Sequence, residues 1–172
     1  YARTQEIYAA MIEILDINVG RLIETLEETG QLENTVIVFT SDHGASTAEY
    51  GHTIGRVPSQ GGPILPDFID NRFENWGRPN SFVDHGLGFG EAASAPLEGA
   101  KGTFSEGGLR AAGFVYYPAA VSGGAVNDTF MTMMDILPTF LEIAGTEHPG
   151  AGEHNGREIN GIRGRSFWPH MI

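Results

Sequence analysis

The sequence contains no cysteine among its 172 residues. Within these residues, the lack of thiols excludes disulfide bridges, a cysteine zinc site and a thiol nucleophile. No apolar run is long enough to cross a bilayer, and the first residues lack the basic and then apolar pattern of a signal peptide. A membrane-spanning protein is therefore not expected from this stretch of sequence.

Basic residues are also scarce. The chain has 10 lysines and arginines against 22 aspartates and glutamates, which gives a formal net charge of −12. An acidic chain is poorly suited to hold nucleic acid or an anionic membrane surface by bulk electrostatics, so neither is expected as a partner. A small anionic substrate remains compatible with this charge, because a local cation reverses the field inside a pocket.

Several common catalytic signatures are missing. There is no Walker loop, no Gly-x-Ser-x-Gly elbow, no Gly-x-Gly-x-x-Gly after a strand and no histidine pair with the i, i+4 spacing of a helical zinc site.

The sequence also starts at Tyr1 rather than at a methionine, and it stops at Ile172 without an obvious closing element. We therefore expect a fragment that lacks residues at both ends, which leaves a cytoplasmic and a periplasmic or secreted location both open.

The residues that are present indicate an α/β domain. The composition, with 41% hydrophobic and 19% charged residues, is that of a globular protein, and the length suffices for one domain with a core. Apolar residues at helical spacing predict a helix over residues 4–29, with Gly30 as its C-cap. A buried strand is expected over Val36–Thr40, and a helix followed by a strand is typical of α/β winding.

The second half of the chain repeats this alternation. We expect a strand over Ala111–Tyr117 and a helix over Asp128–Ala144, with Asp128 as N-cap and Gly145 as C-cap. Pro138 predicts a kink or a helix start nearby. The tail from His148 is expected to be irregular.

Residues 44–100 are expected to form a long loop region that walls a site. Glycines and prolines punctuate residues 44–66, Asp67–Trp76 is compatible with a short helix, and residues 77–100 look irregular despite the glycine-rich Gly86–Gly90. Long connections of this kind inside a domain are most often functional.

Asp42 and His43 follow the first strand within Thr40-Ser-Asp-His-Gly44. The carboxyl ends of strands in α/β sheets are where ligands and metals bind. Asp42 supplies oxygens for a divalent cation, and His43 supplies a nitrogen ligand or a proton donor. The alternative, in which Asp42 caps a turn and His43 is an ordinary histidine, carries equal weight on this stretch alone.

Lys101 lies in a glycine-flanked turn before the second strand. A lysine in such a turn is able to point inward at an anion, although a surface position is the more common one. Glu106 and Arg110 are expected to pair and brace the turn, and Asp135 to hydrogen-bond backbone or pair with an arginine. His85 is expected in a solvent-exposed loop, with pocket lining as the alternative.

The ordered set of these motifs resembles the sulfatase family. Thr40–Gly44, the segment Lys101-Gly-Thr-Phe-Ser-Glu-Gly-Gly-Leu-Arg110 and Met134-Asp-Ile-Leu-Pro-Thr139 look like the C-terminal part of a sulfatase catalytic domain. The loop from Glu74 to Phe82 is similar to the bacterial arylsulfatase branch. The resemblance covers nearly the whole chain, so residues 1–172 are interpreted as a partial catalytic domain truncated at both ends.

This resemblance implies an alkaline-phosphatase-like α/β fold, a three-layer sandwich around a mixed, mostly parallel sheet. It implies that Asp42 and His43 bind a divalent metal, with Ca²⁺ expected and Mn²⁺ as the alternative, because many sulfatases have Asn in place of His43. His43 would also belong to the catalytic residues, and Lys101 would bind the sulfate group of a small-molecule ester. The nucleophile would be a formylglycine made from an upstream Cys/Ser-x-Pro/Ala-x-Arg motif outside this chain.

The sequence thus predicts a metal-dependent sulfuric ester hydrolase that acts on aryl or alkyl sulfates. A phosphonate monoester or phosphodiester hydrolase of the same superfamily is the alternative enzyme, and a non-catalytic truncated domain is the alternative of another class. We expect the isolated fragment to be inactive. The oligomeric state is not predicted.

Overall fold

The computed structural model describes residues 2–47 and 69–172, which fall into two compact units. Unit 1 consists of the described residues of Tyr1–Leu32 and Thr40–Gly113, and unit 2 consists of Glu33–Phe39 and Phe114–Ile172. The part of the expected loop at residues 48–68, which includes His52, lies outside the described residues. Among the described residues, no helix is both long enough and apolar enough to pass through a membrane.

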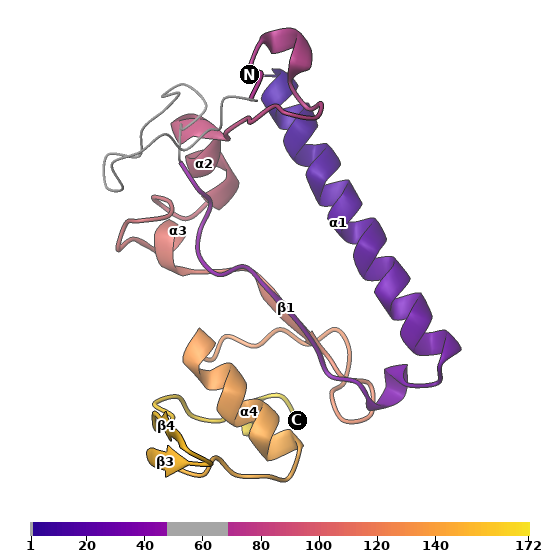
Figure 1. Ribbon diagram of the computed structural model, residues 1–172, viewed down its shortest axis with the longest axis vertical. Coiled ribbons are helices and arrows are strands. Elements are labelled where there is room, and N and C mark those ends of the chain that lie inside the picture. Colours follow the sequence, from indigo (N-terminus) through magenta and orange to yellow (C-terminus); the bar gives the residue numbers. More distant parts are fainter. Residues whose placement is uncertain (1, 48–68) are drawn as a thin grey trace. The chain divides into compact units, whose positions relative to one another are not determined.

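Helix α1, Ala2–Glu28, is the first element of unit 1 and confirms the helix expected over residues 4–29 (Figure 1). Its C-terminus closes as predicted, since Gly30 has a φ of 66° and donates its N–H to the carbonyl of Glu27 at 3.0 Å. Gln31 donates in turn to Leu26 at 2.8 Å. Glycine adopts this left-handed conformation without a steric penalty, which ends the helix at a defined residue.

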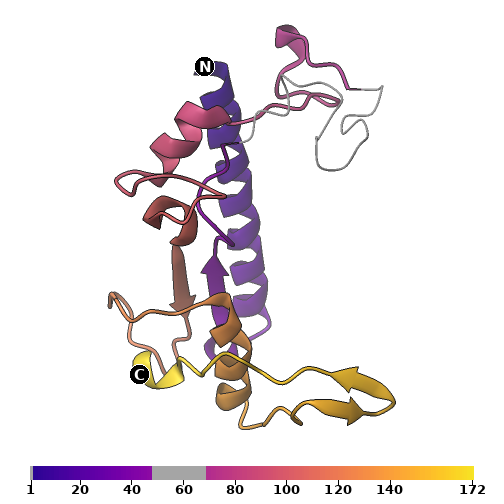
Figure 2. The ribbon, with the colours of Figure 1, turned by 90° about the vertical axis from the view of Figure 1, so that its left-hand side faces the viewer.

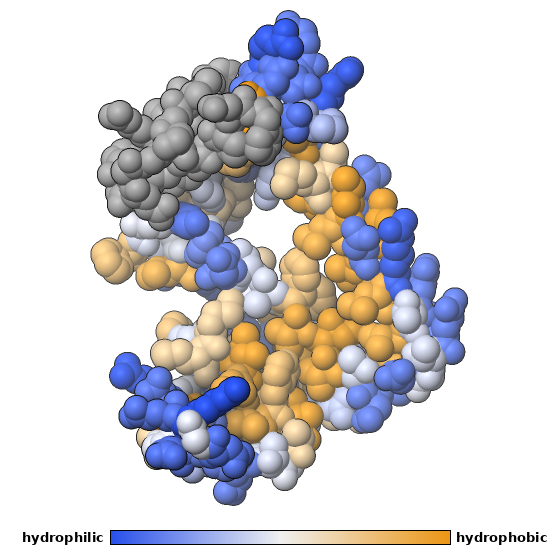
Figure 3. Space-filling model, viewed as in Figure 1, coloured by the Kyte–Doolittle hydropathy of each residue, from blue (hydrophilic) through white to orange (hydrophobic). Residues whose placement is uncertain are grey.

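Apolar side chains gather along one side of α1 and charged ones along another (Figure 3). No residue of this helix is buried, and Met11 and Leu22 are exposed over 62% and 57% of their surfaces. The apolar face of α1 is therefore largely uncovered by the other described residues.

The segment after residue 68 is organised by side-chain hydrogen bonds rather than by the short helix expected over Asp67–Trp76. Asp67 and Phe68 lie outside the described residues, and within residues 69–76 only a 3₁₀ turn, Phe73–Asn75, forms. The indole N–H of Trp76 donates to the carbonyl of Asn71 at 3.0 Å, and Asp70 pairs with Arg72 at 2.6 Å. Hydrogen bonds from Arg72 lower the pKa of Asp70 from 3.8 to about 2.

Residues 77–100 are not irregular throughout, which corrects the expectation for the glycine-rich stretch. Helix α2, Gly86–Ser94, begins at the first of these glycines. Gly90 is buried against Ser46, and a Cβ at this position would lie only 2.6 Å from the Ser46 carbonyl oxygen. Tertiary packing outweighs the low intrinsic helix propensity of glycine here. A short helix α3, Glu106–Leu109, was not predicted.

The predicted strands are present in shorter form, β1 at Ile37–Thr40 and β2 at Gly113–Tyr116, and all of their residues except Thr40 and Gly113 belong to unit 2. The two strands form a two-stranded sheet, and their arrows point in opposite directions (Figure 2). The 3₁₀ turn Leu32–Asn34 precedes β1.

Helix α4, Ile136–Ile143, is shorter than the helix expected over Asp128–Ala144, and Asp128 is not its N-cap. The 3₁₀ turn Met133–Asp135 leads into it, and Thr132 and Asp135 form a capping box there. Pro138 lies in the first turn of α4, where its missing N–H has no intrahelical partner to lose. The prediction of a helix start near Pro138 is therefore confirmed.

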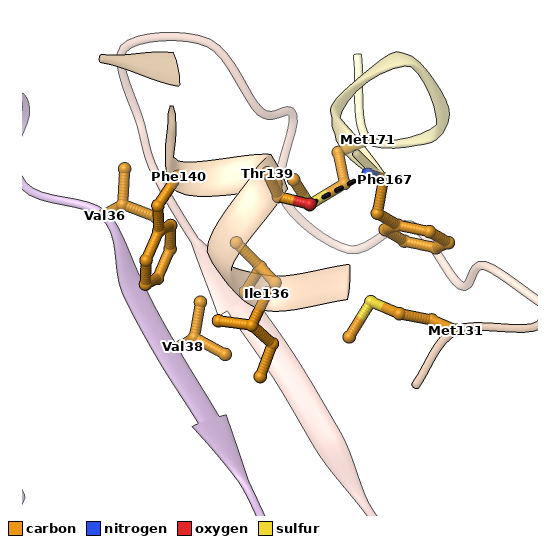
Figure 4. Close-up of a pocket in the computed structure, with 9 residues that line it drawn as sticks. Val36, Val38, Met131, Ile136, Thr139, Phe140, Phe167 and Met171 are labelled. Carbon is orange, nitrogen blue, oxygen red and sulfur yellow. Dashed lines mark hydrogen bonds between the residues drawn. The ribbon is translucent and has the colours of Figure 1, made fainter. Parts of the chain in front are cut away.

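The core of unit 2 lies between β1, β2 and α4 (Figure 4). A small cavity of about 20 Å³ remains between them. Thr139, 5% exposed, points its hydroxyl at the N–H of Phe167 and accepts a hydrogen bond at 2.8 Å. The residues lining the cavity are almost entirely apolar: Val36, Val38, Val115, Met131, Ile136, Thr139, Phe140, Phe167 and Met171.

The tail from His148 contains a hairpin where an irregular chain was expected. Strands β3, Gly152–His154, and β4, Arg157–Ile159, pair in antiparallel fashion. Asn155 and Gly156 connect them with φ values of 50° and 75°. Asn-Gly is the preferred pair for a type I′ turn, so the hairpin could have been predicted from the Asn155-Gly156 pair. A last 3₁₀ turn covers Trp168–His170.

Candidate functional site

The candidate site starts where the chain leaves β1. Ser41 donates its N–H to the carbonyl of Ala112 at 3.0 Å, so the chain remains beside its partner strand for one more residue. The Ser41 hydroxyl then donates to the carbonyl of His43 at 2.7 Å and closes a tight turn. This turn places the side chains of Asp42 and His43 beyond the end of the strand, as the sequence predicted.

Asp42 and His43 face each other within this turn. The His43 Nε2 atom lies 3.1 Å from Oδ2 of Asp42, and the His43 Nδ1 atom lies 2.9 Å from the carbonyl oxygen of Gly44. The side chain of Asp42 is 80% exposed and that of His43 is 36% exposed. In the described structure, the side chains of Asp42 and His43 are thus both accessible to a ligand from solvent.

The surroundings of its two ring nitrogens determine how His43 presents its ring. A carbonyl oxygen only accepts, so Nδ1 carries a hydrogen that it donates to Gly44. In the neutral ring Nε2 then has a lone pair directed at a carboxylate oxygen, and two such acceptors at 3.1 Å repel each other. A metal ion bound by both groups would relieve this repulsion.

The geometry fits metal binding in a second respect. Histidines that bind metals usually donate their other ring N–H to a carbonyl or carboxylate, which fixes the tautomer. The bond from Nδ1 of His43 to Gly44 supplies this arrangement. However, no group of at least three histidine, aspartate or glutamate side chains converges within residues 2–47 and 69–172. Within these residues, Asp42 and His43 are therefore too few to form a coordination shell by themselves.

A backbone hydrogen bond joins the Lys101 loop to the chain just after the Asp42–His43 turn. The Lys101 N–H donates to the carbonyl of Ala45 at 2.9 Å, two residues after His43. The next residue, Gly102, has a φ of 90°, which turns the chain sharply. The side chain of Lys101 is exposed, which is the surface position that the sequence left as the alternative.

A second backbone contact joins the Asp42–His43 turn to α3. Gly44 donates its N–H to the carbonyl of Gly108 at 3.2 Å. A Cβ on Gly44 would coincide with the carbonyl of Gly107, so only glycine permits this approach. Gly107 and Gly108 are themselves buried. The structure thus connects Asp42, His43 and Lys101 through short backbone links within unit 1.

Two neighbouring charged residues have structural roles, as predicted. Glu106 and Arg110 form an ion pair at 3.3 Å across one turn of helix, and both side chains are about two-thirds exposed. Exposed pairs of this kind contribute little to stability, so this pair orients the turn more than it stabilises it.

His85 does not lie in a solvent-exposed loop. It is half-buried next to the first residue of α2 and stacks on Tyr8 at a ring distance of 4.3 Å, with Phe89 5.9 Å away on the same helix. Burial lowers its pKa, so the neutral ring is favoured. The stacking partner Tyr8 comes from α1, a long-range contact that local sequence patterns do not reveal.

The family of the chain follows from sequence comparison. A sequence model of the Sulfatase family matches residues 3–146, which include Asp42, His43 and Lys101. The chain therefore belongs to the sulfatase family, as the ordered motifs indicated. Membership implies an alkaline-phosphatase-like α/β fold.

Individual relatives agree with this assignment. The chain is 40% identical over 171 residues to an uncharacterized sulfatase of Schizosaccharomyces pombe, covering 99% of this chain and 30% of that protein. It is 33% identical over 153 residues to an arylsulfatase of Klebsiella aerogenes, covering 85% of this chain and 30% of the relative. It is 30% identical over 152 residues to a mouse steryl-sulfatase, with coverages of 88% and 19%. The chain thus spans less than a third of the length of these relatives.

Proposed function

We propose that this chain is the C-terminal part of the catalytic domain of a metal-dependent sulfatase that hydrolyses aryl or alkyl sulfate monoesters. The observation that carries the proposal is the backbone linkage of the Asp42–His43 turn to the Lys101 loop, at 2.9 Å between Lys101 N and Ala45 O. This linkage joins the two segments that carry a carboxylate, an imidazole and an ammonium group. The names of the Klebsiella and mouse relatives support sulfate esters as substrates.

In this proposal Asp42 and His43 would hold a divalent cation, Ca²⁺ in the first place and Mn²⁺ as the alternative. The carboxylate of Asp42 suits either ion, and the imidazole of His43 suits Mn²⁺ better than Ca²⁺. When bound, such a cation supplies positive charge that stabilises the sulfuryl oxygens during ester cleavage. His43 keeps its Nε2 lone pair available because Nδ1 donates to Gly44.

Lys101 binds a sulfate oxygen in the proposed site. Its ammonium group is a compact charge on a flexible stem, and the Ala45 bond fixes the backbone from which the stem extends. Charge that develops on the transferred group is stabilised more strongly than the ground state, which is how such a contact accelerates the reaction.

The proposed nucleophile lies outside these residues. A formylglycine would be formed in an upstream Cys/Ser-x-Pro/Ala-x-Arg motif of the complete protein. In the same complete domain, β1 and β2 would belong to the mixed, mostly parallel sheet of a three-layer sandwich, and residues 44–100 would wall the site.

A phosphonate monoester or phosphodiester hydrolase of the same superfamily is the second candidate. His43 favours it slightly, because many sulfatases have asparagine at this position, whereas related phosphonate and phosphate ester hydrolases, like some sulfatases, use histidine. An upstream Cys/Ser-x-Pro/Ala-x-Arg motif and faster turnover of a sulfate than of a phosphonate ester would support the sulfatase.

The decisive experiment compares Asp42→Ala and Lys101→Ala in the complete protein. Asp42→Ala removes a carboxylate ligand, so we expect loss of stoichiometric bound metal by elemental analysis and loss of phenyl sulfate hydrolysis. Lys101→Ala should retain the metal but reduce kcat by roughly two to four orders of magnitude.

The exposed ion pair provides the matched control. Glu106→Gln removes a carboxylate from α3, in the same unit, and should leave the metal content unchanged and turnover within about threefold of the wild type. Unchanged turnover with metal still bound in Asp42→Ala would overturn the assignment. A decrease in kcat of less than about threefold in Lys101→Ala would mean that Lys101 is an ordinary surface lysine that does not bind the sulfate.

A further inference from the structure

Ser94 is the last residue of α2, and its side chain contacts α3. The half-buried hydroxyl of Ser94 donates a hydrogen bond to the carbonyl of Gly107 at 3.2 Å. A Cβ on Gly44 would overlap this same carbonyl oxygen, so the end of the Asp42–His43 turn packs directly against it. Ser94 therefore binds the peptide group on which the turn rests.

The two glycines of α3 depend on other segments to hold them in place. Glycine has no Cβ, so Gly107 and Gly108 have more conformational freedom than other residues, and a helix of four residues restrains them little. Gly107 donates its N–H to the carbonyl of Glu98 at 2.8 Å, while its own carbonyl accepts the bond from Ser94. Glu98 and Ser94 thus hold both polar backbone groups of Gly107.

The same two glycines lie between the two segments of the candidate site. Gly44 donates its N–H to the carbonyl of Gly108 at 3.2 Å, and a Cβ on Gly108 would lie 2.6 Å from the carbonyl oxygen of Ala100. Ala100 is buried and directly precedes Lys101. Because backbone packs on backbone at both contacts, a shift of the glycines displaces the Asp42–His43 turn, the Lys101 loop or both.

A second residue of α2 contacts the same region. Gly90 lies four residues before Ser94 and therefore on the same face of the helix. Gly90 is buried, and a Cβ there would lie 2.6 Å from the carbonyl oxygen of Ser46, two residues after Gly44. One face of α2 thus packs on the chain that leaves the Asp42–His43 turn and binds α3 through the Ser94 hydroxyl.

We propose that Ser94 is a positioning residue of the site. Its bond to the Gly107 carbonyl fixes the spacing between the Asp42–His43 turn and the residue that precedes Lys101. Ser94 acts through the backbone of α3, so its removal weakens metal binding and turnover without removing a ligand. This inference rests on the proposed function of Asp42, His43 and Lys101.

The test combines calorimetric titration of Ca²⁺ and of Mn²⁺ into the metal-free complete protein with steady-state hydrolysis of phenyl sulfate. Ser94→Ala should raise the Kd of the metal about tenfold and lower kcat about tenfold, the effect that residues behind a metal ligand commonly have. KM should stay within about threefold of the wild type, because the groups that react are displaced rather than lost. Ser94→Thr keeps the hydroxyl donor and should restore the metal Kd and kcat to within about threefold of the wild type.

Ser122→Ala is the matched control. Ser122 is exposed and belongs to unit 2, so loss of its hydroxyl should leave the metal Kd and kcat within about twofold of the wild type. Metal Kd and kcat within about twofold of the wild type in Ser94→Ala, with or without a lowered Tm, would overturn the inference. Losses in Ser94→Thr as large as those in Ser94→Ala would overturn it too, because the hydroxyl would then not be the group that matters.

Failure of the proposed function has a different signature. If the wild-type complete protein binds neither Ca²⁺ nor Mn²⁺ and does not hydrolyse phenyl sulfate, the sulfatase assignment fails whatever Ser94 does. Hydrogen exchange measured by mass spectrometry then decides the positioning separately. Faster exchange in Ser94→Ala of the peptides that cover residues 42–46 and 105–109 supports it, and unchanged exchange overturns it.

Discussion

At the scale of single residues, Asp135 shows how one carboxylate joins two segments of unit 2. Its Oδ2 accepts hydrogen bonds from the N–H and hydroxyl of Thr132 at 2.7 and 3.0 Å, and its Oδ1 accepts from the N–H of Arg165 at 2.8 Å. The backbone hydrogen bonds from Arg165 and Thr132 lower its pKa below the ordinary value of 3.8. Folding therefore favours the ionised form.

Asp135→Ala should lower the free energy of unfolding by about 1–2 kcal/mol at neutral pH, because it removes a helix cap and leaves donors unpaired. Urea denaturation of the complete protein measures this change. Asp128→Ala is the control, since Asp128 does not cap α4, and its effect should stay within about 0.5 kcal/mol.

The effect of Asp135 also has a defined pH dependence. A carboxylate with a lowered folded-state pKa contributes stability above the ordinary value of 3.8, and this contribution is lost as the pH falls through the lower folded-state value. The difference between wild type and Asp135→Ala should therefore shrink in strong acid. A difference that stays constant down to pH 2 would contradict the role of the ionised form.

The positions of the candidate site residues in the fold could be predicted from sequence where the signal is local. Asp42 and His43 directly follow a strand, and Lys101 lies in a glycine-flanked turn, so pattern and position sufficed. The bond from His43 Nδ1 to Gly44 could not be predicted, because it depends on side-chain rotamers. The stacking of His85 on Tyr8 depends on a tertiary contact between distant segments.

At the scale of elements, the contact between the Asp42–His43 turn and α3 positions the site. Gly44→Ala would drive a Cβ into the carbonyl of Gly107, so the two segments must separate. We expect kcat/KM for phenyl sulfate to fall about 100-fold, as displacement of catalytic groups by about 1 Å commonly has this effect. Steady-state kinetics on the complete protein provides the measurement.

Gly88→Ala is the control for this substitution. Gly88 lies in α2, and a Cβ there has no atom within 4 Å. Alanine also has the higher helix propensity, so activity should be unchanged and stability equal or slightly increased. Full activity of Gly44→Ala would show that the two segments adjust without loss of geometry.

The elements with strong periodicity were predictable, and those that rely on packing were not. Helix α1, strands β1 and β2 and the core of α4 follow from apolar spacing and local caps. Helix α2 was missed because its glycines oppose helix formation in isolation, whereas contact with Ser46 favours it in the folded chain. The β3–β4 hairpin was missed although Asn155-Gly156 is a strong turn signal.

At the scale of the whole molecule, large apolar side chains remain exposed on several elements. Leu32 and Ala100 are the buried apolar residues of the described part of the chain, at 8% and 3% exposure. The aromatic pair Phe39 and Phe114, stacked at 5.1 Å, is also partly exposed, on β1 and β2. Such surfaces are what a chain presents when it covers less than a third of its relatives.

We therefore expect the isolated 172-residue chain to show no sulfatase activity. It contains no cysteine, and the proposed nucleophile belongs to an upstream motif. Phenyl sulfate hydrolysis by the isolated chain and by the complete protein at equal concentration tests this. Turnover by the isolated chain above the uncatalysed rate would show that the residues described suffice for chemistry.

The direct backbone contact of Gly44 with Gly107 limits how far the Asp42–His43 turn and α3 can move relative to each other. Long side chains exchange between rotamers, so a distance that they define fluctuates and changes with every substitution. Peptide groups are planar and stiff, so a distance that is set by the contact of two peptide groups varies little. The separation between the Asp42–His43 turn and α3 should then stay constant when the surrounding side chains are replaced.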